Sequence, residues 1–149
     1  MKYVAFLRGI NVGGNTKIPM ADLKKLFEGL GYKNVKTVLN SGNVVFDGKH
    51  VDENNIEENL EKKFGFKISL ILRNEQEIKK LIKKNSPEKL TPNKRFYVTF
   101  IKGKPEVCNV VDLNSKGTTD MMKDLEKKYG KEITTRNWNT LLKILLLLN

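Results

Sequence analysis

The residues best suited to chemistry are the glycines and cations of one loop near the N-terminus. Gly9-x4-Gly14 followed by Asn15 and Thr16 approaches the spacing of a P-loop, in which backbone N–H groups and a lysine hold phosphates. The essential lysine is missing, because Asn15 stands in its place and Lys17 comes two residues later. We therefore predict an anion-binding loop that is not a true P-loop, with candidate ligand-binding residues Arg8, Gly9, Asn11, Gly13, Gly14, Asn15 and Lys17. The alternative is that its glycines only permit positive φ angles in a turn.

Two other polar segments are candidates for the same site. The first is a turn between two predicted strands, where the candidates are Asn40, Ser41 and Asn43. The second is segment 134–140, which we predict to open a helix with Thr135 as its N-cap, so that free N–H groups favour an anion. Its candidates are Thr135, Arg136, Asn137 and Asn139. We expect loop 8–17 and segment 134–140 to meet in one polar pocket. The alternative for the turn at 40–43 is that its residues serve only the turn geometry. The alternative for segment 134–140 is a buried polar network.

The rest of the chain offers little for catalysis or metal binding. The single cysteine, Cys108, excludes an internal disulfide, and with the single histidine, His50, it cannot make an ordinary zinc or haem site. No carboxylate pair and no nucleophile with a base stand at a recognisable motif spacing, so no catalytic residue is assigned. The sequence favours a binding protein without metal or cofactor over an enzyme.

Positive charge suggests a second function. Lys and Arg number 28 against 17 Asp and Glu, which gives a net charge of +11, and residues 76–149 hold most of the excess. Since lysine supplies 24 of the basic residues, an A/T-rich genome would also explain the bias. One alternative function is a sequence-tolerant nucleic-acid-binding module that contacts phosphates through Lys79, Lys80, Lys83 and Lys84. The other is a structural or protein-interaction module that uses the apolar C-terminus.

The elements that position these residues alternate between strands and helices. In the first half we predict strands at 3–7, 35–39, 43–46 and 67–72 and helices at 19–30 and from Asp52 to Gly65. This order, βαββαβ, predicts a ferredoxin-like subdomain over residues 1–73. Its strands at 3–7 and 44–46 are apolar on both faces, so we expect the second half to cover the face opposite its own helices.

The second half predicts a smaller α+β subdomain over residues 74–149, packed against the first. We predict helices at 75–84, from Thr118 or Thr119 to Tyr129, and at 136–148, and strands at 95–101 and 107–112. The last helix carries Trp138, Leu141, Leu142 and Leu145 as its predicted buried stripe. The run of leucines at 145–148 either docks fully or forms an oligomer contact.

No apolar run approaches the roughly 18 residues needed to span a bilayer. The apolar run at the start of the chain is too short for a signal peptide, and a charged residue follows it too soon. We therefore expect a cytoplasmic protein with no membrane partner.

Three long motifs are spread over the chain. They are residues 6–15, reading Phe-Leu-Arg-Gly-Ile-Asn-Val-Gly-Gly-Asn and followed by Ile-Pro-Met at 18–20; residues 40–44, reading Asn-Ser-Gly-Asn-Val; and residues 134–140, reading Thr-Thr-Arg-Asn-Trp-Asn-Thr. Together they resemble the bacterial domain-of-unknown-function family 1697. The resemblance implies an α+β fold and brings no established activity. The chain departs from the family pattern in a short connection at 102–106 and at 116–120.

Overall fold

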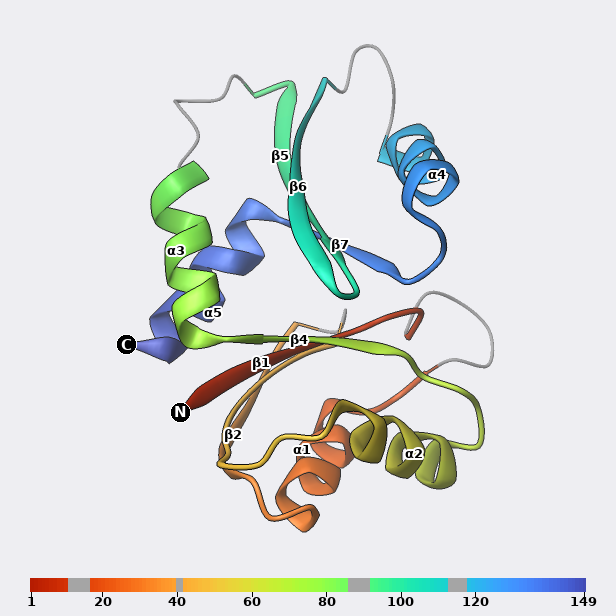
Figure 1. Cartoon of the computed structure of the whole chain (residues 1–149), viewed down its shortest axis with the longest axis vertical. Coiled ribbons are helices and arrows are strands. Elements are labelled where there is room, and N and C mark those ends of the chain that lie inside the picture. Colours follow the sequence, from red (N-terminus) through yellow and green to blue (C-terminus); the bar gives the residue numbers. More distant parts are fainter. Residues whose placement is uncertain (11–16, 40–41, 86–91, 113–117) are drawn as a thin grey trace.

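Two antiparallel sheets with helices packed on them form the described part of the chain (Figure 1). The structure, a computed structural model, describes residues 1–10, 17–39, 42–85, 92–112 and 118–149. Its elements are β1 (Lys2–Leu7), α1 (Met20–Gly29), β2 (Lys33–Val38), β3 (Asn43–Asp47), α2 (Glu53–Phe64), β4 (Leu70–Asn74), α3 (Glu75–Asn85), β5 (Lys94–Ile101), β6 (Lys104–Asp112), α4 (Thr118–Tyr129), β7 (Ile133–Asn137) and α5 (Trp138–Leu148). The predicted α+β class is confirmed.

The first sheet has the strand order β2-β3-β1-β4, with every neighbour antiparallel. It is built from the predicted βαββαβ sequence of elements. Helix α2 begins at the predicted cap, because the Asp52 carboxylate accepts the N–H groups of Asn54 and Asn55 at 3.0 and 3.3 Å. Helices α1 and α2 bury Phe27 and Leu60 against one face of this sheet.

The second sheet has the order β6-β5-β7, so the central strand β5 pairs with a neighbour on each side. Helix α4 covers part of one face, where Leu125 packs on Ile101 and Ile133. Strand β6 forms one edge of the sheet, and within the described residues it has no strand beyond it.

One core joins the two halves. Val4, Phe6 and Val45 point away from α1 and α2 and are fully or almost fully buried among residues of α3, β5 and α5. The rings of Phe6 and Phe100 stack with centroids 4.1 Å apart across this junction. In Figure 1 the second half accordingly lies on the side of the first sheet opposite α1 and α2. The expected cover over this second face is confirmed.

The segment before the last helix corrects one prediction. Residues 134–136 were expected in or beside a helix, but they lie in β7, where Thr135 pairs with Thr99 of β5 and the two hydroxyls are 2.8 Å apart. The β-branched run Ile133-Thr134-Thr135 suits a strand, and pairing with β5 satisfies its backbone. Thr135 is therefore not the N-cap.

Helix α5 instead begins at Trp138, and its N-cap is Asn137, whose Oδ1 accepts the N–H of Thr140 at 2.9 Å. The buried face of α5 also differs from the prediction. Leu141 is buried as expected, but Leu142 is 40% exposed, and Ile144 and Leu148 complete the buried stripe. Trp138 and Leu145 are partly buried against the same core, so Leu142 is the one member of the predicted stripe that turns to solvent.

Because the two halves share one core, we expect them to unfold together. Phe100→Ala should lower the free energy of unfolding by about 3–5 kcal/mol, since it removes the ring stacked on Phe6. The measurement is denaturant unfolding followed by far-UV circular dichroism and by the fluorescence of Trp138, the only tryptophan. Both signals should shift to the same midpoint. Leu146→Ala, at a position 75% exposed, is the control and should change little. Separate transitions for the two signals would contradict the shared core.

Candidate functional site

The three sequence motifs converge on the side chain of Arg136. This residue lies in β7, is 6% exposed and reaches across to the first sheet. A guanidinium carries five N–H donors. The acceptors of Arg136 are Asn43 Oδ1 for Nε at 2.7 Å, Thr134 Oγ1 and Thr135 O for Nη1 at 2.6 and 3.0 Å, and Leu7 O and Gly42 O for Nη2 at 2.7 and 3.4 Å.

These bonds make Arg136 a junction between the halves. All five donors are engaged by acceptors within the chain, so a ligand would have to displace one of them. The guanidinium also lies 5.7 Å from the centre of the Phe6 ring. Burial lowers the pKa of Arg136 to about 10, which still leaves the group charged at neutral pH. The geometry suits a structural role for Arg136, and a ligand-binding role has no free donor to use.

The turn that Arg136 contacts is held close to the end of β1. Gly42 has a φ of +88°, and a Cβ there would lie 2.7 Å from Ile10 Cδ1 and 2.9 Å from Leu7 Cβ. The N–H of Leu7 donates to Gly42 O at 2.8 Å. The Asn43 side chain is fully buried and its Nδ2 donates to Val38 O at 2.7 Å. Gly42 and Asn43 are thus required by packing and by hydrogen bonds of the turn itself.

The other candidates of the predicted site are dispersed. Arg8 pairs with Glu126 of α4 at 2.9 Å, with both side chains partly exposed. Gly9 and Lys17 are exposed, as is Asn139 on α5. The predicted candidates Asn11, Gly13, Gly14, Asn15, Asn40 and Ser41 lie outside the described residues. The segment around Arg136 does meet the end of β1 through Leu7, whereas the Arg8 side chain engages a different element.

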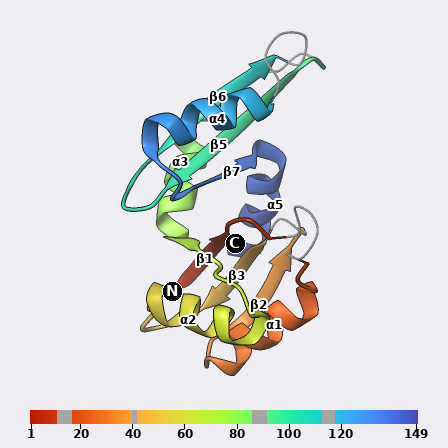
Figure 2. The ribbon, with the colours of Figure 1, turned by 90° about the vertical axis from the view of Figure 1, so that its right-hand side faces the viewer.

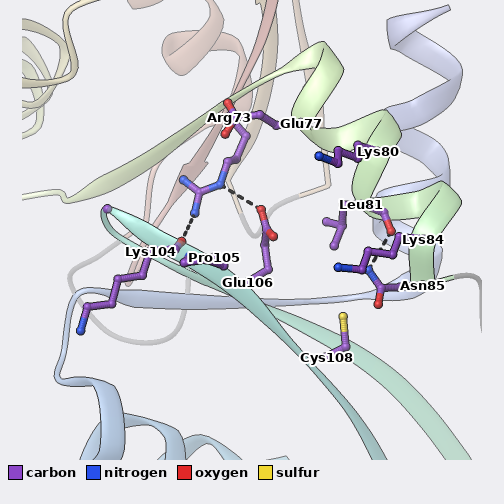
Figure 3. Close-up of a pocket in the computed structure, with 11 residues that line it drawn as sticks. Arg73, Glu77, Lys80, Leu81, Lys84, Asn85, Lys104, Pro105, Glu106 and Cys108 are labelled. Atoms are coloured by element: carbon purple, nitrogen blue, oxygen red, sulfur yellow. Dashed lines mark hydrogen bonds and ion pairs between the residues drawn. The ribbon is translucent and has the colours of Figure 1, made fainter.

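A cleft of about 610 Å³ lies elsewhere, between α3 and β6 (Figure 3). Sequence reasoning did not anticipate it. Lys80, Leu81 and Lys84 line the helix side, and Glu106 and Cys108 line the strand side. The alternation of β6 turns Glu106 and Cys108 to the same face. The i, i+4 spacing of the two lysines is visible in the sequence, but the packing that sets α3 beside β6 is not.

Buried Arg73 closes one end of the cleft. Its Nη2 donates to Ile101 O and Lys104 O, both at 3.0 Å, and its Nε donates to Glu106 at 3.3 Å. Arg73 thereby ties the turn between β5 and β6 to strand β4. The other acid of this end, Glu77, is engaged in the cap of α3: its carboxylate accepts the N–H of Asn74 at 3.0 Å, and Asn74 Oδ1 accepts the N–H of Glu77 at 2.9 Å. Both carboxylates of the cleft therefore have a partner.

The opposite end of the cleft is cationic. Lys80 and Lys84 are exposed, and neither makes an ion pair with another described residue. Lys84 and Cys108 line this end from opposite sides of the cleft, and in Figure 3 the Lys104 side chain runs away from the helix. Two of the lysines predicted to contact phosphates, Lys80 and Lys84, line this cleft. The other two lie outside its lining: Lys79 pairs with Glu75 at 3.6 Å, and Lys83 is exposed.

Cys108 is half-buried, and its pKa is raised by burial and, to a lesser degree, by the negative charge of Glu106. The thiol is therefore protonated at neutral pH and is a poor nucleophile there. In the described ranges no group of three or more His, Cys, Asp or Glu side chains could hold a metal ion. The same ranges contain no helix with both the length and the apolar character required to cross a membrane.

Comparisons with known proteins agree with the fold. A family model described as "Protein of unknown function (DUF1697)" matches residues 1–129. The chain belongs to the DUF1697 family. A solved structure, that of the conserved bacterial protein SP0830 from Streptococcus pneumoniae, superposes on this DUF1697 chain with a TM-score of 0.67 at 24% sequence identity, covering 99% of this chain and 98% of the other. None of the curated proteins matches the chain.

In this DUF1697 protein we expect the two arginines of the motifs to differ sharply in their effect on stability. Arg136→Lys keeps the charge but leaves three donors for five acceptors, so the free energy of unfolding should fall by about 3 kcal/mol or more. Arg8→Ala removes only a partly exposed ion pair and should cost about 1 kcal/mol or less. Denaturant unfolding measures both variants, and equal losses would contradict the structural role of Arg136.

The reactivity of Cys108 reports on its surroundings in this family member. Because Glu106 helps to raise the thiol pKa, Glu106→Gln should lower it and speed alkylation at a fixed pH near 8. The cationic Arg73, freed from Glu106, would act in the same direction. Iodoacetamide rates as a function of pH, followed by mass spectrometry, give the pKa directly. Glu132→Gln, on the exposed surface, is the control and should leave the profile unchanged; slower alkylation of Glu106→Gln would refute this assignment.

Proposed function

We propose that this protein binds anionic ligands and that the anion docks in the cleft between α3 and β6. The observation that carries the proposal is the pair Lys80 and Lys84, which line a cleft of about 610 Å³ without an ion pair to any described residue. Two ammonium groups beside a concave surface raise the local concentration of anions. The cleft stays net positive, because Glu106 is paired with Arg73 and only the charge of Glu77 stands against the two lysines.

The chemistry of the cleft suits a carboxylate or a phosphate joined to a less polar group. Lysines act as flexible point charges and accept either anion. Leu81, Pro105 and Cys108 add an apolar wall against which the rest of a ligand can pack. The raised pKa of Cys108 argues against a thiolate nucleophile, so binding is favoured over catalysis.

This site differs from the anion-binding loop predicted at 8–17. Residues 11–16 of that loop lie outside the described residues, and its flanking cation Arg8 is already paired with Glu126. Arg136, the other cation predicted there, has all five donors engaged. The described contacts therefore support the cleft more strongly than the loop as the place where an anion binds.

The test compares two double variants of one helix. Lys80→Ala/Lys84→Ala removes the cleft pair, and Lys79→Ala/Lys83→Ala removes the same charge at the same spacing outside the cleft. Tripolyphosphate is the probe, and its affinity is measured by calorimetry and by protection of Cys108 from alkylation. We expect the cleft variant to bind at least about tenfold more weakly, the loss of one charge-assisted contact, and the control variant to bind like the wild type.

Equal losses in the two double variants would overturn the cleft as the site. If an oligonucleotide then bound with an affinity that grew with its length and fell steeply with salt, the alternative of a sequence-tolerant nucleic-acid-binding surface would replace it. Protection of Cys108 separates the two cases, because a ligand spread over the exposed face of α3 leaves the cleft open to the alkylating reagent.

A further inference from the structure

Strand β6 presents an unpaired edge beside the cationic cleft. It is the outermost strand of its sheet, and across the described part of the chain β5 is the only backbone partner of residues 106–111. A strand with one open edge offers a row of N–H and C=O groups that can pair with another extended chain. Proteins usually protect such an edge with charged residues or proline, so the residues of β6 show whether its edge can accept another strand.

The protection of β6 is confined to its first residues. Pro105 has no N–H to donate, and Lys104 O is already taken by Arg73 at 3.0 Å. From 107 to 111 the strand reads Val-Cys-Asn-Val-Val, with no charge and no proline. Val110 in this stretch is 52% exposed although apolar. The second part of β6 is thus an open edge with an uncovered apolar side chain.

Helix α3 supplies a second wall beside the part of this edge that holds Glu106 and Cys108. Figures 1 and 2 show α3 and the hairpin of β5 and β6 in the same half of the molecule, and the cleft is lined by both α3 and β6. An edge strand with a helix beside it is a groove in which a peptide can add to the sheet, taking backbone hydrogen bonds from the strand and side-chain contacts from the helix. The charge of the helix wall then selects the side chains of the peptide.

We propose that the cleft binds an extended acidic peptide segment, which pairs with β6 as an added strand and directs its carboxylates at Lys80 and Lys84. The proposal rests on the anion-binding function of the same cleft. The spacing fits: four residues of helix rise about 6 Å, and two residues of a strand rise about 6.6 Å. Acidic residues at alternate positions of the peptide therefore match the two lysines, whereas adjacent acids would point to opposite faces of the sheet.

The sequence of the preferred peptide follows from these contacts. Acidic side chains alternate with β-branched ones, which favour the extended conformation and face the other side of the sheet. Residues 106–111 span about 20 Å of strand, enough to pair with six residues of peptide. A second copy of β6 is a poorer occupant, because its stretch from 107 to 111 has no acid to offer the lysines.

The test uses three eight-residue peptides with blocked ends. The first alternates glutamate and valine; the second has the same composition with its glutamates in adjacent pairs; the third is the first with N-methyl groups on the backbone nitrogens that would face β6. Calorimetry gives the affinity, Cys108 protection reports occupancy of the cleft, and hydrogen exchange reports pairing along residues 106–111. We expect the first peptide to bind at least tenfold more tightly than the other two and to slow exchange in β6.

Two double variants and two probes distinguish binding of the peptide from binding of a simple anion. Lys80→Ala/Lys84→Ala should weaken the first peptide, and Lys79→Ala/Lys83→Ala should not. Equal binding of the N-methylated peptide would refute strand addition. Binding of tripolyphosphate without binding of the first peptide would refute the peptide and leave the anion-binding function standing, whereas the failure of both probes would refute that function as well. Dimerisation in place of peptide binding would show β6 paired with itself and would also overturn the proposal.

Discussion

The first sheet has two apolar faces, and its own helices cover only one of them. Leaving Val4, Phe6 and Val45 in water would forfeit the transfer free energy of three large side chains, about 1.5–3 kcal/mol each. The second half supplies the cover through α3, β5 and α5. Because α3 and the hairpin of β5 and β6 are both fixed by this core, the cleft between them is a consequence of how the first sheet is buried.

A polar contact sets the register of this apolar packing. Hydrophobic contact tolerates small slips, but a guanidinium with acceptors in fixed directions does not. Arg136 bonds to the end of β1 and to the turn before β3, so it fixes where β7 sits on the first sheet. The cost of burying its charge is met by close acceptors from three segments. The residue that most resembled a ligand-binding arginine in the sequence is therefore better explained as a structural one.

Local patterns predicted most elements of the fold. The cap at Asp52, the stop at Gly65 and the apolar strand at 3–7 each carry a signal within a few residues. Strand β7 was missed because its threonines also suit a helix cap, and only pairing with β5 decides between the two. The cleft was missed for a related reason. Lys84 and Cys108 are distant in sequence and ordinary in type, and only tertiary packing places them in the lining of one cleft.

The contacts of Arg136 also have a consequence for synthesis on the ribosome. Leu7 and Gly42 emerge long before Arg136, as do the apolar residues that α5 will cover. At about 5–20 residues per second, residues 75–148 take about 4–15 s to translate. Throughout that interval the apolar face of the first sheet lacks the cover that α5 provides, and the Leu7 carbonyl lacks the guanidinium of Arg136. The helix that completes the shared core, α5, is therefore the last element of the described fold to be synthesised.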